Sequence, residues 1–198
     1  MRRAVILFAV MAMVMALSTG VATAAAKYGT QGRDSLRGTD RADELYGRGG
    51  GDVLLGRGAG DALYGGKGND FVGGGRGTVE GNVKFDRRGF VVRIVPDGKD
   101  KIYGGSGRDW LFAGSNDDVT YGGDGDDTLG IFFFEFIFDT GNDIFYGGDG
   151  NDEIWSFDGD LSKPSRDIVY CGDGRDVVFA DRLDRVSDDC ERVRRLRF

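Results

Sequence analysis

Aspartate recurs every nine residues along most of the chain, and this period constrains the fold more than any other feature. The spacing of nine holds within four blocks: Asp34, Asp43, Asp52, Asp61 and Asp70; Asp100, Asp109, Asp118 and Asp127; Asp143 and Asp152; Asp167 and Asp176. A short repeat of fixed length is typical of a solenoid, in which each unit buries its apolar face only by stacking on its neighbours. The sequence therefore predicts one repeat array of thirteen units.

Each Asp closes a glycine-rich turn and precedes a short apolar segment. Residues 65–72 read G-G-K-G-N-D-F-V and residues 104–111 read G-G-S-G-R-D-W-L, and residues 122–129 and 147–154 repeat the form. Glycine permits positive φ angles, so the backbone bends sharply and its carbonyl oxygens turn toward one place. A carboxylate then completes an anionic, all-oxygen shell that suits a hard cation such as Ca²⁺. The pattern predicts metal-binding turns joined by short strands.

The eighth residue of each unit is a large apolar residue, except for one threonine. In a three-residue strand the middle side chain faces one way and its neighbours face the other. We therefore expect a single inward column made of Leu36, Leu45, Leu54, Leu63, Val72, Ile102, Leu111, Thr120, Leu129, Phe145, Ile154, Val169 and Val178.

The tyrosines indicate how the units stack. All seven occupy the ninth position: Tyr28, Tyr46, Tyr64, Tyr103, Tyr121, Tyr146 and Tyr170. Their regular spacing is twice that of the aspartates, and three gaps are longer by the same amounts as the three long gaps between aspartate blocks. One coil therefore holds two units, every tyrosine lies on the same outer wall, and three inserts interrupt the array without changing its phase.

Two units per coil place the aspartates on two edges. The consensus edge, whose turns follow each tyrosine, holds Asp34, Asp52, Asp70, Asp109, Asp127, Asp152 and Asp176. The insert edge, whose turns are degraded and carry all three inserts, holds Asp43, Asp61, Asp100, Asp118, Asp143 and Asp167. We expect all thirteen to be metal ligands, the consensus edge binding more strongly, with backbone carbonyls around Gly47, Gly65, Gly104, Gly122 and Gly147 completing the shells.

The unit G-G-x-G-x-D-x-U-x, in which U is a large apolar residue, resembles the haemolysin-type calcium-binding repeat, also called RTX, over about residues 29–179. The resemblance implies an all-β fold, a right-handed parallel β-roll with two units per coil and inserted loops or a hairpin on one edge. It also implies that several Ca²⁺ ions bind between coils and drive folding. A structural, adhesion or surface module is the function that this favours.

Relatives often attach such repeats to enzymes, so the alternative is a calcium-dependent secreted enzyme or accessory module that acts on polysaccharide. The HExxH and GxSxG motifs are absent, and the chain contains no histidine. No pair of carboxylates stands apart from the expected metal positions, as a glycosidase would need. The sequence therefore favours a protein without catalytic residues.

Residues 1–26 have the pattern of a secretory signal peptide. Two arginines precede an apolar run from Ala4 to Leu17, followed by small residues that offer A-x-A cleavage sites. The run is shorter than the ~20 residues of a membrane span, so we expect an extracellular protein with no stable span after cleavage. Cleavage removes two positive charges and lowers the net charge from −7 to −9, which argues against nucleic-acid binding.

The inserts lie near residues 74–95, 131–138 and 156–161. The first is expected to form a hairpin, and the second places Phe132, Phe134, Phe136 and Phe138 on one face of a strand. Those side chains either cap the thin core or form an exposed contact for a partner or lipid surface. A cell surface, a polysaccharide or a protein is the partner we expect at this edge.

After Asp176 the spacing shortens to eight, which ends the predicted roll of residues 27–179. Residues 180–198 resemble the cysteine-closed tail of secreted relatives, which implies a disulfide between Cys171 and Cys190 and a C-terminal cap. Secretion permits such a bond, and a repeat array needs capped ends.

Overall fold

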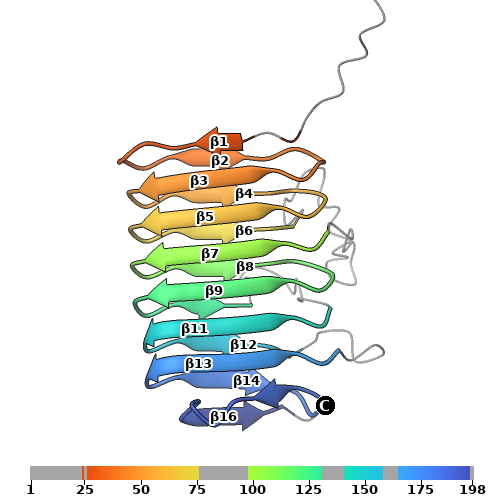
Figure 1. Cartoon of the computed structure of the whole chain (residues 1–198). Helices are drawn as coiled ribbons and strands as arrows, with labels where there is room; N and C mark the ends of the chain where they lie inside the picture. Colours follow the sequence, from red (N-terminus) through yellow and green to blue (C-terminus); the bar gives the residue numbers. More distant parts are fainter. Residues whose placement is uncertain (1–23, 25, 76–97, 131–140, 158–164, 197–198) are drawn as a thin grey trace, which may run out of the picture.

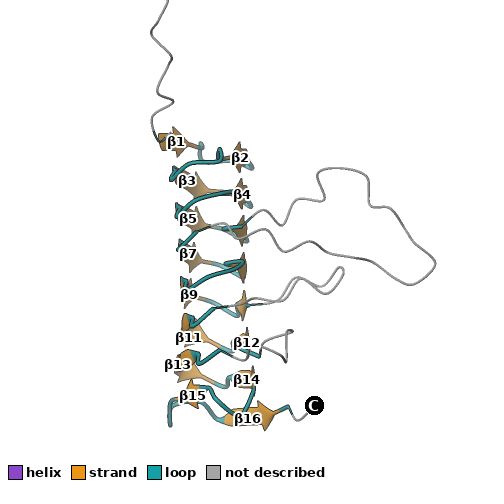
Figure 2. Cartoon of the chain, turned by 90° about the vertical axis from the view of Figure 1, so that its right-hand side faces the viewer, coloured by secondary structure: helices purple, strands orange, loops and turns teal. Residues whose placement is uncertain are grey.

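The computed structural model describes residues 24, 26–75, 98–130, 141–157 and 165–196. They form two parallel sheets of eight strands that stack as two facing columns (Figures 1 and 2). Successive strands of the chain alternate between the sheets, so each coil contributes one strand to each column. The predicted all-β parallel roll with two units per coil is confirmed.

The first sheet contains, in order, β1 (Ala26–Tyr28), β3 (Glu44–Gly49), β5 (Ala62–Lys67), β7 (Lys101–Ser106), β9 (Val119–Asp124), β11 (Ile144–Gly150), β13 (Ile168–Gly174) and β15 (Arg185–Val186). The second contains β2 (Ser35–Arg37), β4 (Val53–Leu55), β6 (Phe71–Gly73), β8 (Trp110–Phe112), β10 (Thr128–Leu129), β12 (Glu153–Trp155), β14 (Val177–Ala180) and β16 (Arg192–Arg195).

The inserts do not change the register of the stack. Leu45 pairs with Leu63, one regular coil further along the chain, and Leu63 pairs with Ile102, which lies beyond the first insert. Equivalent positions therefore meet across every coil, as the phase of the aspartates predicts. Residues 1–23, 25, 76–97, 131–140 and 158–164 lie outside the described part of the chain, so what we expect of the signal peptide and the inserts stays a prediction.

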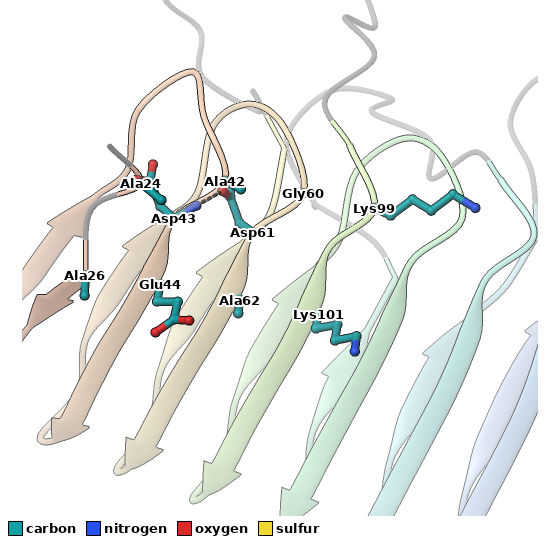
Figure 3. Close-up of a pocket in the computed structure, with 10 residues that line it drawn as sticks. All are labelled: Ala24, Ala26, Ala42, Asp43, Glu44, Gly60, Asp61, Ala62, Lys99 and Lys101. Atoms are coloured by element: carbon teal, nitrogen blue, oxygen red, sulfur yellow. Dashed lines mark hydrogen bonds between the residues drawn. The ribbon is translucent and has the colours of Figure 1, made fainter. Parts of the chain in front are cut away.

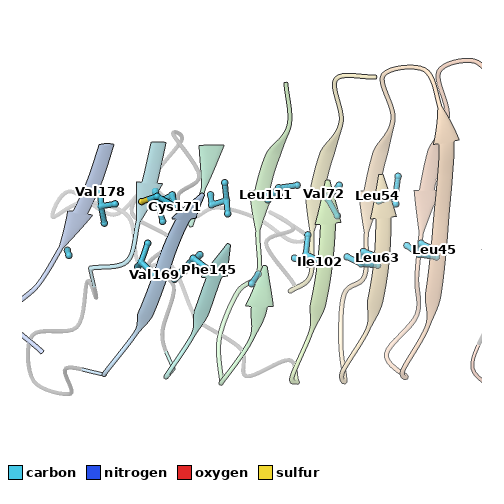
Figure 4. Close-up of a cluster of buried hydrophobic side chains, with 14 residues drawn as sticks. Leu45, Leu54, Leu63, Val72, Ile102, Leu111, Phe145, Val169, Cys171 and Val178 are labelled. Atoms are coloured by element: carbon cyan, nitrogen blue, oxygen red, sulfur yellow. The ribbon is translucent and has the colours of Figure 1, made fainter. Parts of the chain in front are cut away.

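The core is the predicted inward column of side chains, arranged as two facing rows, one from each sheet (Figure 4). Twelve of its thirteen predicted members are at most 1 % exposed, including Thr120, which stands among apolar neighbours. Leu36 is only half-buried, because its strand β2 pairs on one side with β4 and begins the stack. The column is one side chain deep, so little apolar surface is buried for each residue ordered.

The tyrosines form the predicted wall on the outer face of the first sheet. Neighbouring rings lie 4.7–5.0 Å apart between centroids, with planes within 10° of parallel, from Tyr28 through to Tyr170. This separation is that of hydrogen-bonded strands, so the ring stack follows directly from the strand register.

The tail continues the stack. β15 pairs with β13 and β16 pairs with β14, so the residues after Ala180 add a further strand to each sheet. The predicted disulfide between Cys171 and Cys190 is present, with 5.2 Å between the Cα atoms. It fastens the tail to the last glycine-rich turn.

The described residues contain no helix that is long and apolar enough to span a membrane.

Candidate metal centre

The turns of the consensus edge depend on two residues with positive φ. In the turn before Asp70, Gly66 has φ +111° and Gly68 has φ +123°, and the equivalent glycines of the following turns repeat these values closely. Non-glycine residues with positive φ are commoner on the insert edge, where Arg57, Ala59 and Asn116 adopt it, than on the consensus edge, where Arg48 does so among the described residues. The degraded turns thus keep the backbone shape at the expense of strain.

We expect Gly68→Ala to lower the unfolding free energy of the calcium-loaded protein by about 3 kcal/mol or more, because a methyl group there would collide with the carbonyl oxygen of Gly50. The matched change Ala59→Gly, at φ +65°, should instead raise it by about 1 kcal/mol. Urea unfolding in saturating calcium measures both. Similar small losses in the two variants would show that the turns are not under this constraint.

The predicted aspartates line the two edges and are buried, except Asp34 of the first coil, which is half-buried. Each carboxylate reaches back to the preceding coil. The Oδ1 atom of Asp70 accepts a hydrogen bond from the backbone N–H of Asp52 at 2.7 Å, and Oδ1 of Asp127 accepts one from Asp109 at 2.8 Å. The same bond recurs on both edges at 2.6–2.9 Å (Figure 3 shows it between Asp43 and Asp61).

The other carboxylate oxygen differs between the first coil and the rest. In the first coil the N–H and hydroxyl of Thr30 donate to Oδ2 of Asp34, and those of Thr39 donate to Oδ2 of Asp43. Along the rest of the consensus edge, within the described residues, Oδ2 is buried without a hydrogen-bond partner in Asp52, Asp70, Asp109, Asp127, Asp152 and Asp176. A buried acceptor without a donor is costly, and an anionic one more so.

In every one of these turns except that of Asp176, a carbonyl oxygen of the next coil lies near the orphaned atom at the first glycine of the turn. A methyl group built on Gly65 would lie 2.6 Å from Oδ2 of Asp70 and 2.6 Å from the oxygen of Gly104. On Gly104 it would lie 2.5 Å from Oδ2 of Asp109 and 2.6 Å from the oxygen of Gly122. We call this space, which glycine leaves open, the cradle of the turn.

At Gly47, Gly122 and Gly147 the added methyl group would likewise lie close to Oδ2 of the Asp of that turn and to a backbone carbonyl oxygen of the next coil. A carboxylate oxygen and a backbone carbonyl are both ligands that Ca²⁺ prefers. The described residues bring together no group of three or more Asp, Glu, Cys or His side chains that could hold a metal. An ion in a cradle would therefore depend on backbone carbonyls, the ligands that the glycine-rich turns predict.

Burial raises the pKa of the consensus-edge carboxyls. It raises the pKa of Asp109 and Asp152 to about 6 and that of Asp127 to about 8, and it also raises the pKa of Asp70 and Asp176. The backbone N–H of the preceding Asp opposes this effect, while neighbouring carboxylates add to it. These groups are poorly placed to remain ionised alone, so they favour either a proton or a cation.

The insert edge is less uniform at the first position of its turns. Gly38, Gly56 and Gly74 stand there in the first coils, but Ala113, Ser156 and Ala180 stand there later. A hollow of about 510 Å³ lies beside this edge near the start of the roll, between Glu44 and Lys99 (Figure 3). Glu44 accepts a hydrogen bond from Tyr46, and Lys99 pairs with Asp117 at 2.7 Å. Both charged groups beside the hollow therefore already have partners within the roll.

The row of hydrogen bonds from each Asp N–H to a carboxylate of the next coil, which we call the ladder, includes two acids that the sequence period did not reveal. Oδ1 of Asp184 accepts from the N–H of Asp167 at 3.2 Å, and Oε2 of Glu191 accepts from the N–H of Asp176 at 2.9 Å. Both acids follow their partners by less than two full units, which hides them from a search for a fixed period.

Comparison with known sequences agrees with this geometry. The family model for the RTX calcium-binding nonapeptide repeat matches four times, at residues 28–63, 49–78, 97–129 and 139–160, which together make up more than half of the chain. Repeats of this kind bind several Ca²⁺ ions in one domain. No curated protein and no solved structure matches the chain.

Proposed function

The chain belongs to the RTX calcium-binding nonapeptide repeat family, generally a structural calcium-binding module, and from this we propose that it is an extracellular β-roll that folds as its turns take up Ca²⁺. In this proposal residues 1–26 are a signal peptide, residues 27–179 form the roll and residues 180–198 cap it. The disulfide supports an oxidising compartment outside the cytosol.

The orphaned Oδ2 atoms of the consensus edge carry the proposal. In Asp52, Asp70, Asp109, Asp127 and Asp152 this atom faces a carbonyl oxygen of the next coil across a glycine, so one cation could satisfy a buried anion and link two coils together. The ligands would be Asp52, Asp70, Asp109, Asp127 and Asp152, with the carbonyls of Gly65, Gly104, Gly122, Gly147 and Cys171. Bound calcium would supply the positive charge, and the chain would supply the oxygen ligands and their spacing.

Repulsion along each edge explains why a cation is needed. Ionised carboxylates in successive coils stand one strand spacing apart, about 4.8 Å. At an effective dielectric constant of 20, each pair repels by about 3 kcal/mol. Calcium would remove this repulsion and fill the cradles, so its binding free energy becomes part of the free energy of folding.

The biological role that follows is that of a calcium-stiffened structural or adhesive module. Each insert falls in the sequence between a strand of the second sheet and the next strand of the first, so the inserts interrupt neither the tyrosine wall nor the turns of the consensus edge. We propose that the insert edge contacts a cell surface, a polysaccharide or a protein.

Isothermal titration with CaCl₂ tests the proposed calcium binding, and absence of binding by the mature chain would contradict it.

An aspartate whose Oδ2 atom has no donor should respond to mutation differently from one whose Oδ2 atom is already hydrogen-bonded. Asp109→Ala should weaken calcium-induced folding more than Asp43→Ala, because Oδ2 of Asp109 has no donor while Oδ2 of Asp43 already accepts from Thr39. We expect about a tenfold rise in the calcium midpoint for Asp109→Ala, which corresponds to about 1.4 kcal/mol. Equal shifts in a calcium titration followed by circular dichroism would contradict the role assigned to the orphaned Oδ2 atom of Asp109.

A further inference from the structure

The last turn of the consensus edge breaks the glycine rule at its first position. Cys171 stands where Gly47, Gly65, Gly104, Gly122 and Gly147 stand in the preceding turns. The register is unambiguous, since Tyr146 pairs with Tyr170 and Gly148 pairs with Gly172 on either side of it. The side chain of Cys171 therefore projects from the position whose added methyl group would fill the cradle in every earlier turn.

The carboxylates of this edge have a direction. Oδ1 of each Asp holds the coil before it, as Oδ1 of Asp176 holds the N–H of Asp152 at 2.8 Å. Oδ2 faces the coil after it, as Oδ2 of Asp109 faces the oxygen of Gly122. An ion at a given turn would thus join that coil to the next, and an ion beside Asp176 would join the last coil to the tail.

The tail already makes that connection with its own groups. The carboxylate of Asp189 accepts from the N–H of Gly172 at 3.2 Å, and that of Glu191 accepts from the N–H of Asp176 at 2.9 Å. Cys171 is fully buried and belongs to the core, as Figure 4 shows. It is bonded to Cys190, which packs against the core from the tail. Where earlier turns offer an open cradle, this one holds a covalent bond to the next layer.

We propose that the Cys171–Cys190 disulfide takes the place of the terminal calcium ion, so that Asp176 binds no metal although it occupies a ligand position of the repeat and its Oδ2 atom is also buried without a hydrogen-bond partner. This inference rests on the proposed calcium binding at the other turns. It makes the C-terminal end of the roll independent of calcium, and dependent instead on oxidation of the two cysteines.

The test compares two isosteric changes in adjacent coils of the full mature chain. Asp152→Asn and Asp176→Asn each remove one carboxylate and keep an Oδ1 atom that can accept the hydrogen bond from the N–H of the preceding coil. Native mass spectrometry in CaCl₂ should find one ion fewer in Asp152→Asn and the wild-type number in Asp176→Asn. Loss of an ion from Asp176→Asn would overturn the proposal. Loss from neither variant would instead contradict calcium binding at the consensus edge.

A disulfide-free variant provides a second, independent measurement. Cys171→Ala with Cys190→Ala breaks the bond but leaves a methyl group in the cradle, so the number of bound ions should equal that of the wild type. The calcium midpoint of folding should rise severalfold, because the covalent link to the tail is gone. One ion fewer in this variant would show that calcium lies beside the disulfide, and would also overturn the proposal.

Discussion

In metal-free buffer near neutral pH the mature chain is expected to be largely unfolded, and addition of calcium should fold it in one steep transition. The core is only one side chain deep on each sheet, and glycine makes the unfolded state unusually broad. Folding must also either bury ionised carboxylates that repel one another along the consensus edge or protonate them. Without a cation these costs outweigh the apolar burial.

The transition should be cooperative because each ion would bridge two coils. Occupancy of one cradle helps to dock the next coil, which assembles the next cradle. We expect a midpoint of about 10⁻⁴–10⁻³ M, the range of extracellular calcium modules, and poor replacement by magnesium, which requires tight octahedral geometry.

Far-UV circular dichroism with stepwise CaCl₂ or MgCl₂ measures this transition. A β-rich spectrum that persists in excess chelator would contradict it, since packing alone would then hold the roll. A gradual change across many decades of calcium concentration would contradict the coupling between coils.

Acidification should partly replace calcium. The pKa of Asp109 and Asp152 is raised to about 6 and that of Asp127 to about 8 in the folded roll, mainly by burial, against about 3.9 in an unfolded chain. The folded state therefore binds protons more tightly than the unfolded state. This contribution is fully present below about pH 4 and is lost as the pH rises through about 6 and then about 8.

The metal-free chain should accordingly gain β structure as the pH falls from about 8 to about 5. As the pH rises from about 6 to about 8, the free energy of unfolding should fall by about 1.4 kcal/mol per pH unit through Asp127 alone. The measurement is circular dichroism of protein dialysed free of metal, because chelators lose their affinity for calcium in acid.

Two neighbouring variants test the assignment to Asp127. Asp127→Asn should flatten the dependence between about pH 6 and pH 8, because the amide does not titrate. Asp126→Asn should keep a dependence of the same steepness and move it only toward lower pH. Hydrogen bonds from Asn151 and Arg108 lower the pKa of Asp126, so it titrates at more acidic values, but its charge is among those that raise the pKa of Asp127. An equally steep pH dependence in Asp127→Asn would show that another group controls stability between about pH 6 and pH 8.

The phase of the repeat was enough to predict the architecture. Because the side chains of a short strand alternate, the position of Leu63 within its unit determines that it faces inward, and that of Tyr64 that it faces outward. The inserts leave this phase intact, so the pairing of Leu63 with Ile102 followed from counting residues. The disulfide followed from resemblance rather than from spacing.

The details of the site depend on atoms that a period does not distinguish. Nothing in the repeat separates Oδ1, which holds the preceding coil, from Oδ2, which is left without a donor. Asp34 satisfies the repeat as well as Asp52, yet Thr30 donates to its second oxygen. Asp184 and Glu191 were missed because the tail reaches equivalent positions with fewer residues per coil.

The alternation of strands between two columns has a mechanical consequence. The described chain begins at one end of the stack and finishes at the other, and each coil pairs only with its neighbours (Figure 1). Tension applied between those ends would act on one inter-coil contact at a time. A regular coil of two units that detached would lengthen the chain by about 60 Å. Coils that carry inserts would release more, and the disulfide would hold the last coil to the tail, so peeling would proceed from the N-terminal end.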